Sequence, residues 1–559
     1  MKPKLDLLKP AFNLNYLDYF ILACIFLIPL IWSKYLNANY VSAKTFLVYF
    51  ISSFSLVVSS RRLVIPKLPR VLMYSLIFLI VLHLISPVIS QSWTHFYYTF
   101  KFISFSLLAY YFYTLPFNLE AFLKKYDYII LVVSGLIIAF ACNDFYYSRI
   151  DRLDTQSGLL LGSFGNVNMV AEFLVLSLPF IHLWMRIKTS IHSVLKTTIL
   201  IGWLFFILYC RSRSAWIGLG LWGVWSVWNK QVGKKEILAV IIGFTLYHVS
   251  FLAPAVEVAA ALGGAKQDSF GQRLHLYQTT LRLIADHPFG VGVGQYITEI
   301  VPYLVNSDFK PMEYVFFDQP HSEILKWAVQ FGWLGFLLPA LILAYLFVQI
   351  YKQKNFFLTS SFMVLLPQIA FQFPFENPAS LTYISFLFAC CLKLYPVARE
   401  HSINIKKRIL FNVIAVVGMF HSVAFVSSIF FETSHGNRLD LVMYSCDVYP
   451  ININACFNRA HFLLTANNLV LARYAMAENL TQFPFHAGML RLFPIYLKNA
   501  VGDKPSCEAV LMYDSIFSDQ KFFQKELLQQ CSSYKVPLTH QNPQQFKQDY
   551  LKWQRQFFN

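Results

Sequence analysis

Four residues of this chain are the candidates for binding a phosphate-type anion or moving a proton, namely Arg211, Arg213, Arg273 and His321. A guanidinium is always charged, and its planar fork binds phosphate oxygens in pairs. An imidazole has a pKa near neutrality and can take a proton from a hydroxyl group. These residue types are therefore candidates for binding an anion and for moving a proton.

Two of the four lie in the one long polar interruption of the chain, residues 254–322. Arg273 begins an amphipathic helix pattern in Gly271–Tyr296, and a glycine-rich turn follows His287-Pro288. His321 lies at the end of the loop in Asp-Gln-Pro-His-Ser-Glu, residues 318–323. Asp318 or Glu323 can orient the imidazole, although His321 after a proline can also simply begin a helix.

Other polar groups occur at short turns between apolar segments. Arg211 and Arg213 share the turn Cys-Arg-Ser-Arg-Ser, and Glu376 stands between two prolines, where it can hold the fold together or orient a cation. Asn166 and Asn168 follow a glycine cluster and lead into a helix. Their amides can cap that helix or bind a hydroxyl-rich ligand.

The composition places these groups on a membrane protein. Apolar residues make up 57% of the 559 residues and charged residues only 13%, and the mean hydropathy is +0.49. We predict an all-α polytopic fold of about thirteen transmembrane helices, the first a retained helix and not a cleaved signal peptide. The predicted spans are 17–33, 42–60, 71–90, 100–116, 127–145, 168–186, 195–210, 213–229, 236–253, 323–350, 355–372, 378–396 and 409–431.

The net charge of +17 sets topology and does not indicate nucleic acid, because Lys and Arg are spread through short loops. With the N-terminus inside, the inside segments hold about twice the Lys and Arg of the outside loops before the tail. The segments 61–70 and 393–408 contribute most to this bias. The long loop and the C-terminal tail then lie outside, and the arginines at 211 and 213 run against the bias, which favours a ligand for them.

We predict that the chain consists of four segments: transmembrane helices 1–9 (1–253), the catalytic loop (254–322), transmembrane helices 10–13 (323–431) and a helical, TPR-like tail (432–559). The tail holds Cys446, Cys456, Cys507 and Cys531, and in an oxidising compartment these permit three pairings. We predict Cys446 with Cys456 and Cys507 with Cys531, because sequence-near partners bring helical hairpins together. No pair has zinc spacing, and P-loop, HExxH, GxSxG and CxxC motifs are absent.

Four stretches together resemble the O-antigen ligase (Wzy-C-type) superfamily, most of all its PglL-type protein O-oligosaccharyltransferases. The resemblance spans roughly residues 155–400 and is carried by LGSFGNVNMVAEFL, RSRSAWIGLGL, GQRLHLYQTTLRLIADHPFGVGVGQY and PHSEILKWAVQFGWLGFLL. The family's arginines match Arg213 and Arg273, and its histidine matches His321. The sequence departs from the family at Ser322, where Asn is usual, and at Gln330, where an acidic residue is common.

The resemblance implies a metal-independent glycosyltransferase of the bacterial inner membrane with its active site facing the periplasm. The expected donor is an undecaprenyl-diphosphate-linked glycan, held by Arg213, Arg273 and Arg211, and the expected base is His321. The acceptor is a hydroxyl, either Ser/Thr of periplasmic proteins or, as alternatives, lipid A core (an O-antigen ligase) or a growing glycan (a polymerase). A flippase or exporter of lipid-linked glycans is the alternative from another class, but it needs a polar path through the spans, and few charges lie there.

Overall fold

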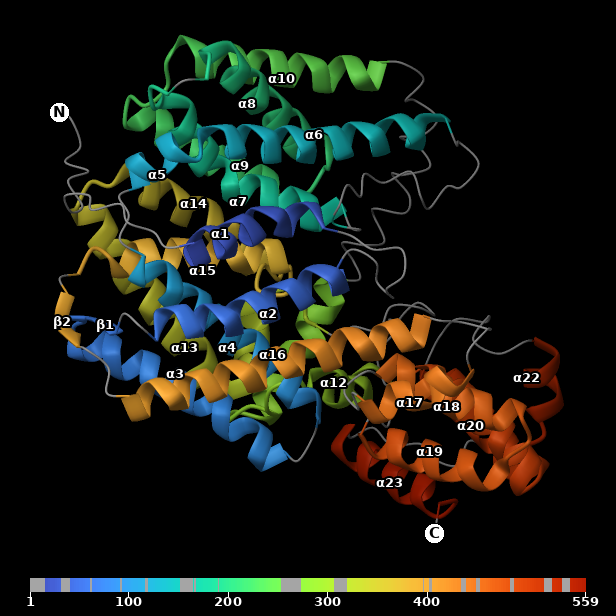
Figure 1. Cartoon of the computed structure of the whole chain (residues 1–559). Coiled ribbons are helices and arrows are strands. Elements are labelled where there is room, and N and C mark those ends of the chain that lie inside the picture. Colours follow the sequence, from blue (N-terminus) through green and yellow to red (C-terminus); the bar gives the residue numbers. More distant parts are fainter. Residues whose placement is uncertain are drawn as a thin grey trace. The chain divides into compact units, whose positions relative to one another are not determined.

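The structure is a computed structural model of the chain, and it is helical apart from one pair of short strands in the described residues (Figure 1). It describes residues 16–31, 41–60, 63–90, 93–115, 119–150, 164, 167–189, 191–252, 273–305, 319–395, 397–401, 405–433, 439–448, 453–482, 487–516, 525–534 and 543–558. Asn166 and Asp318 lie outside these residues.

The helices of the first part are α1 (Tyr16–Leu27), the 3-10 turn η1 (Ile28–Leu30), α2 (Val41–Ser59), α3 (Arg70–Ser90), α4 (Trp93–Thr114), α5 (Leu119–Lys125), α6 (Asp127–Ile150), α7 (Val167–Arg186), α8 (Ser193–Tyr209), α9 (Arg213–Trp228), α10 (Lys234–Leu252), α12 (Tyr296–Val305), α13 (Glu323–Lys352), α14 (Phe356–Phe371), α15 (Pro378–Leu392) and α16 (Ile405–Thr433). The tail holds α17 (Leu439–Val448), α18 (Ile453–Thr465), α19 (Leu469–Gln482), α20 (Ala487–Ala500), α21 (Asp503–Ile516), α22 (Lys525–Cys531) and α23 (Pro543–Arg555).

Each predicted span overlaps one of these helices. By length and composition three described stretches are sufficient to cross a bilayer alone: Val167–Arg186, Glu323–Lys352 and Arg408–Ile429. The pair Leu119–Lys125 and Asp127–Asn143, bent by 73°, is a fourth candidate, and several shorter apolar helices accompany them. A helix rises 1.5 Å per residue, so about 17 residues fall short of a core of about 30 Å. The structure therefore has the helices of a membrane protein, and the number of thirteen spans stays a prediction.

The exception to the predicted all-α fold is a two-stranded antiparallel sheet. Strand β1 (Leu63–Pro66) pairs with β2 (Val397–His401), and the register places Leu63 opposite His401. These strands lie in the two basic segments that contribute most to the charge bias. Two loops far apart in the sequence are thus held side by side by backbone hydrogen bonds.

The chain divides into two compact units that are not sequence-contiguous. The first comprises residues 1–78, 100–261 and 338–426, and the second comprises 79–99, 262–337 and 427–559. The four predicted segments are continuous stretches of sequence, whereas each unit of the structure is assembled from three separate stretches that pack together. The long loop shares a unit with the tail because both contribute to one apolar core.

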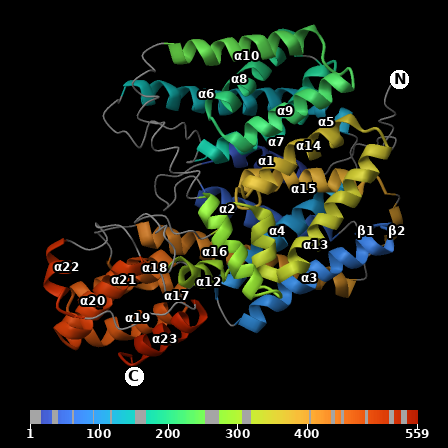
Figure 2. The ribbon, with the colours of Figure 1, turned by 180° about the vertical axis from the view of Figure 1, so that it is seen from behind.

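The first unit is a bundle of helices, many of which run alongside one another (Figures 1 and 2). Within it α9 packs on α14, α8 packs on α10, and α7 packs on both α8 and α14. Helix α7 is buried along most of its length, including Trp184 and Glu172, while α10 exposes Ile237, Ile241 and Phe244. A central α7 and an apolar outer surface are what a bundle in hydrocarbon requires.

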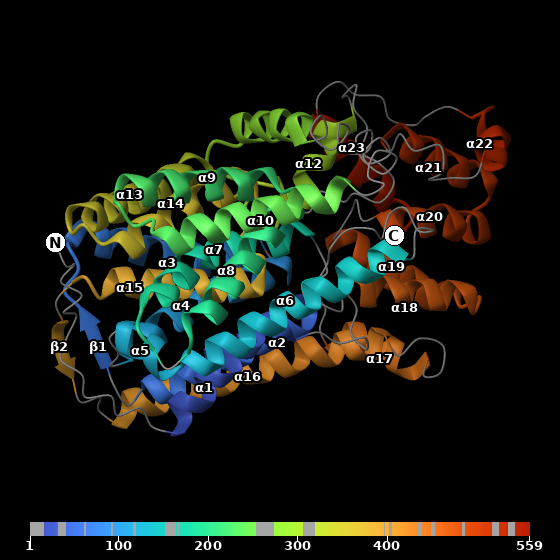
Figure 3. The ribbon, with the colours of Figure 1, turned by 90° about the horizontal axis from the view of Figure 1, so that it is seen from above.

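The second unit has a core that runs from the loop into the tail. Leu276 and Leu283 of the loop, Ile300 of α12, and Phe493 and Phe546 of the tail belong to one buried cluster. Helix α12 packs against α21 and α23, and Figure 3 shows α23 beside α12. The tail therefore supports the loop directly.

The structure pairs the four tail cysteines as predicted. Cys446 bonds to Cys456 with the Cα atoms 4.7 Å apart, and Cys507 bonds to Cys531 with the Cα atoms 5.0 Å apart. The first disulfide joins α17 to α18, and the second joins α21 to α22. Cys24, Cys142, Cys210, Cys390 and Cys391, in or beside predicted spans, are free.

Candidate functional site

The helix over residues 273–286 begins at Arg273 and is anchored by its buried apolar residues. Leu276, Leu283 and Ile284 enter the core of the second unit. The last turn is fixed by Tyr303, whose hydroxyl donates to Asp286 Oδ2 at 2.8 Å. Arg273 and Tyr277 are both half-buried and lie one helical turn apart, so they share a face.

The glycine-rich turn after this helix docks against the backbone of α13. The amide of Val291 donates to Val329 O at 2.8 Å, and the amide of Trp333 donates to Pro288 O at 3.1 Å. These bonds are possible because α13 breaks at Gly332, which has φ 65° and ψ −151°. A Cβ on Gly332 would lie 1.9 Å from Pro288 O, so the close approach requires glycine.

This break corrects the prediction of one continuous helix over 323–350. The apolar pattern of the sequence continues through Gly332, so it gives no sign of the break. The break is made by hydrogen bonds from the backbone of residues 288–291. The first turns of α13, up to residue 337, belong to the second unit and the rest to the first. His321 and the start of α13 are thereby tied to the glycine-rich turn.

His321 lies just before α13 with a left-handed backbone, φ 52°. The Tyr277 hydroxyl donates to His321 O at 3.0 Å. Burial, and secondarily the positive charge of Arg273, lower the pKa of His321 from 6.5 to about 4. The imidazole is therefore neutral at pH 7 and able to accept a proton.

The residues after His321 cap α13 and supply a buried carboxylate. Ser322 Oγ accepts from the amide of Leu325 at 3.4 Å, and Ser322 O accepts from the amide of Lys326. Since Ser and Asn are both good N-caps, Ser322 can fulfil this role without the usual asparagine. Glu323 is fully buried and lies 3.7 Å from Lys326 Nζ. Its predicted role in orienting the imidazole stays a prediction.

Arg211 and Arg213 flank the turn between α8 and α9. Arg211, φ 52°, is the residue that ends α8 in a left-handed cap, and Arg213 is the exposed first residue of α9. The turn is held from inside by Ser214, whose hydroxyl donates to Gln368 Oε1 at 3.1 Å. The buried serine and glutamine fix the turn, in which Arg211 is half-buried and Arg213 is exposed.

A second polar cluster in the first unit includes Glu376. Its carboxylate pairs with Lys101 of α4, and both side chains are largely buried. The neighbouring Asn377 caps α15 and donates to Glu172 Oε1 at 3.1 Å. Asn168 lies half-buried in the first turn of α7. Glu376 is thus paired with Lys101, and its role in the site stays a prediction.

The structure brings Arg273 and His321 together with Tyr277 in the second unit. Arg211, Arg213, Glu376 and Asn168 belong to the first unit, and the convergence of Arg213 with Arg273 and His321 stays a prediction. Sequence reasoning missed Tyr277, Lys101 and Gln368. Only Tyr277 had a signal, its position four residues after Arg273 in a helical pattern.

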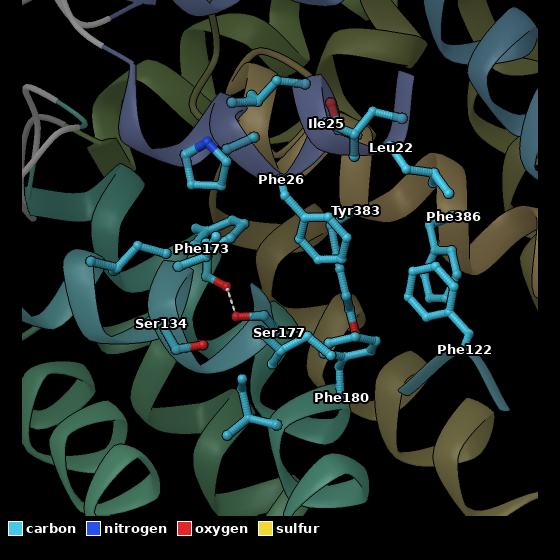
Figure 4. Close-up of a pocket in the computed structure, with 18 of the residues that line it drawn as sticks. Leu22, Ile25, Phe26, Phe122, Ser134, Phe173, Ser177, Phe180, Tyr383 and Phe386 are labelled. Atoms are coloured by element: carbon cyan, nitrogen blue, oxygen red, sulfur yellow. Dashed lines mark hydrogen bonds between the residues drawn. The ribbon is translucent and has the colours of Figure 1, made fainter. Parts of the chain in front are cut away.

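The cavity in Figure 4 lies in the first unit and has no such groups. It has a volume of about 130 Å³, and apolar side chains such as Phe26, Phe173 and Phe386 line it. The hydroxyl of Ser177 donates to Phe173 O at 2.7 Å, the dashed line in Figure 4, so its hydrogen bond is satisfied within α7. No Asp, Glu, His, Lys or Arg lines the cavity, and we do not assign the chemistry to it.

The fold and the loop define a helical membrane protein with a half-buried, neutral histidine beside an arginine. Residues 197–340 match the family model of O-antigen ligases, enzymes that transfer glycans. The match lies within the range of the predicted resemblance and includes Arg211, Arg213, Arg273 and His321. It supports the O-antigen ligase superfamily and a role in glycan transfer. A search of curated proteins finds no match.

Proposed function

We propose that this protein transfers a glycan from undecaprenyl diphosphate to a hydroxyl acceptor, Ser or Thr of proteins, on the periplasmic face of the inner membrane. The observation that carries the proposal is the half-buried, neutral imidazole of His321 beside Arg273, within the segment that matches glycan-transferring enzymes. An anion-binding group and a base in one place are what this reaction needs.

In the proposed step the acceptor oxygen forms a bond to the anomeric carbon of the glycan. The bond from that carbon to the diphosphate oxygen breaks, and undecaprenyl diphosphate leaves with the electron pair. The acceptor proton passes to the neutral imidazole of His321. General-base catalysis of this kind contributes about 10²- to 10⁴-fold.

The pKa of His321 is proposed to change when the donor binds. Burial, and secondarily the charge of Arg273, hold the pKa of His321 down in the free protein. A bound diphosphate would offset the charge of Arg273, and the pKa of His321 would rise toward the range in which an imidazole is an effective base. Arg213 and Arg211 are proposed to bind the same diphosphate by paired hydrogen bonds, so that the reaction needs no metal.

Two features support the sidedness. The β1–β2 pair joins the segments predicted to be cytoplasmic, which agrees with an even number of spans between them. The disulfides of the tail, Cys446–Cys456 and Cys507–Cys531, fit an oxidising compartment. Since the loop shares a core with the tail, both are proposed to lie in the periplasm.

The acceptor is the part of the proposal that has an alternative, namely lipid A core in place of a protein. The helical tail and the Glu376 segment favour protein acceptors, whereas the matched family is described by O-antigen ligation, which favours lipid A core. Both forms use the same donor and the same base. They differ only in the molecule that supplies the acceptor hydroxyl.

The catalytic test is transfer in vitro from purified undecaprenyl-diphosphate glycan, with a chelator present. His321→Ala should reduce transfer by about 10²-fold or more while donor binding stays near wild type. His461→Ala, an exposed histidine of α18, is the matched control and should behave as wild type. Near-normal transfer by His321→Ala would refute the base, and activity lost to the chelator but restored by a divalent ion would refute the metal-free mechanism.

The acceptor test compares a deletion strain with the same strain carrying the gene. Mass spectrometry of periplasmic proteins should show glycosylated Ser or Thr peptides that disappear on deletion. Unchanged glycopeptides together with truncated lipopolysaccharide would replace the protein acceptor with lipid A core.

A further inference from the structure

Tyr277 is the residue that contacts the backbone of His321. Its hydroxyl donates to His321 O at 3.0 Å, and it comes from the helix that also carries Arg273. Burial raises the pKa of the phenol, with Arg273 acting in the opposite direction, so Tyr277 stays protonated and can donate near pH 7. The carbonyl that it binds belongs to the proposed base.

The backbone of His321 needs such support. Five described non-glycine residues have positive φ, and four of them, Arg211, Lys230, Lys354 and Asn467, are the second residue after the end of a helix. Those four are in the left-handed cap position that commonly ends helices. His321 instead precedes α13, and a left-handed non-glycine residue costs about 1–2 kcal/mol. Such a conformation persists when its surroundings fix it.

The surroundings fix His321 from two sides. The amides of Leu325 and Lys326 donate to Ser322, which ties the following residue to α13. Tyr277 ties His321 itself to the helix over 273–286, and that helix is anchored in the core through Leu276 and Leu283. The hydrogen bond thus fixes the base relative to Arg273, which lies one turn from Tyr277.

We propose that Tyr277 is a positioning residue: its hydrogen bond to the His321 carbonyl holds the imidazole in register with Arg273 for proton transfer. This inference rests on the proposed function of His321 as the base. Tyr277 itself gains or loses no proton in the step. It acts on the rate of transfer through His321 and leaves donor affinity to the arginines.

The test is Tyr277→Phe, which removes the hydroxyl and keeps the ring. A misplaced base should lower kcat by about 10- to 100-fold with little change in KM for the donor. In the wild type, kcat/KM should stay high as pH falls from 7 and decline only as pH approaches about 4, where His321 of the free protein is protonated. In Tyr277→Phe a less buried imidazole should lose activity at a higher pH, closer to 6.5.

Tyr303→Phe is the matched control. Tyr303 is buried, and like Tyr277 it donates a hydrogen bond within the second unit, in its case to Asp286 at 2.8 Å. A comparable loss of Tm is expected in both variants, but only Tyr277→Phe should change kcat and the acidic limb of the pH profile. 3-Fluorotyrosine at position 277 keeps the donor and should restore both.

The outcomes separate this inference from the proposed function. Inactive His321→Ala with a wild-type kcat and pH profile in Tyr277→Phe overturns the positioning role and leaves the base intact. A raised donor KM with unchanged kcat overturns it too, because Tyr277 would then contact the donor. Active His321→Ala overturns the proposed function and this inference together.

Discussion

At the residue scale, the proposed chemistry depends on side-chain type as much as on charge. Arg213 is exposed at the first residue of α9, and Arg273 is half-buried beside Tyr277 and His321. Neither guanidinium is buried in a core, so solvent reaches both. A guanidinium gives a diphosphate two parallel hydrogen bonds, which an ammonium group cannot do.

We therefore predict that Arg213→Lys and Arg273→Lys each weaken donor binding and transfer, by about 10-fold or more, although the charge is kept. Donor affinity is measured by titration with undecaprenyl-diphosphate glycan, and transfer by the in vitro assay. Arg282→Lys, at an arginine on the same loop helix given no role in the site, is the control. Full donor affinity in both site variants would remove the arginines from the diphosphate site.

At the scale of elements, the site depends on a break in α13. The turn over residues 288–292 fits only where Gly332 leaves the helical conformation, and Gly290 also approaches closely: a Cβ there would lie 2.5 Å from Gln330 O. The backbone of the loop thus replaces part of the hydrogen bonding of the helix. His321 lies just before α13, and Arg273 lies on the helix over residues 273–286. The turn over residues 288–292 connects to both of these helices.

Gly332→Ala should separate the turn from α13. The added Cβ would meet Pro288 O at 1.9 Å, and the backbone conformation is one that only glycine adopts easily, so we expect a loss of about 3 kcal/mol or more. Tm in detergent and transfer should both fall. Gly223→Ala, where a Cβ meets nothing within 4 Å, should leave both nearly unchanged. Equal effects of the two substitutions would contradict the docking.

At the scale of the whole molecule, the tail and the loop share one unit. Lys547 of α23 pairs with Glu299 of α12, and Phe546 is buried in the same core as Leu276. A tail on the opposite side of the membrane from the loop is incompatible with that core. The loop and the tail therefore lie on the same side of the membrane.

Reporter fusions at about residue 300 and residue 480 should both report the periplasm, because the charge bias places both outside. Fusions within 393–408, the segment that contains β2, should report the cytoplasm and serve as the control. A cytoplasmic signal at residue 300 or 480 would separate the site from a periplasmic substrate.

The sequence by itself determined what depends on local composition and on spacing along the chain. Apolar runs gave helices at all thirteen predicted positions, because a helix satisfies its own backbone groups wherever it forms. The pairings Cys446–Cys456 and Cys507–Cys531 were also predictable, since the partners lie 10 and 24 residues apart. Arg273 and His321 were identifiable by type and motif.

Only the tertiary structure decided what depends on partners distant in the sequence. Tyr277 contacts His321 across 44 residues, and Lys101 pairs with Glu376 across 275 residues. The break at Gly332 follows from backbone that arrives from Pro288, and β1 pairs with a strand more than 300 residues away. Periodicity records which face of one element is apolar. It does not record which other element supplies the matching hydrogen bond, because that is fixed only when distant segments pack.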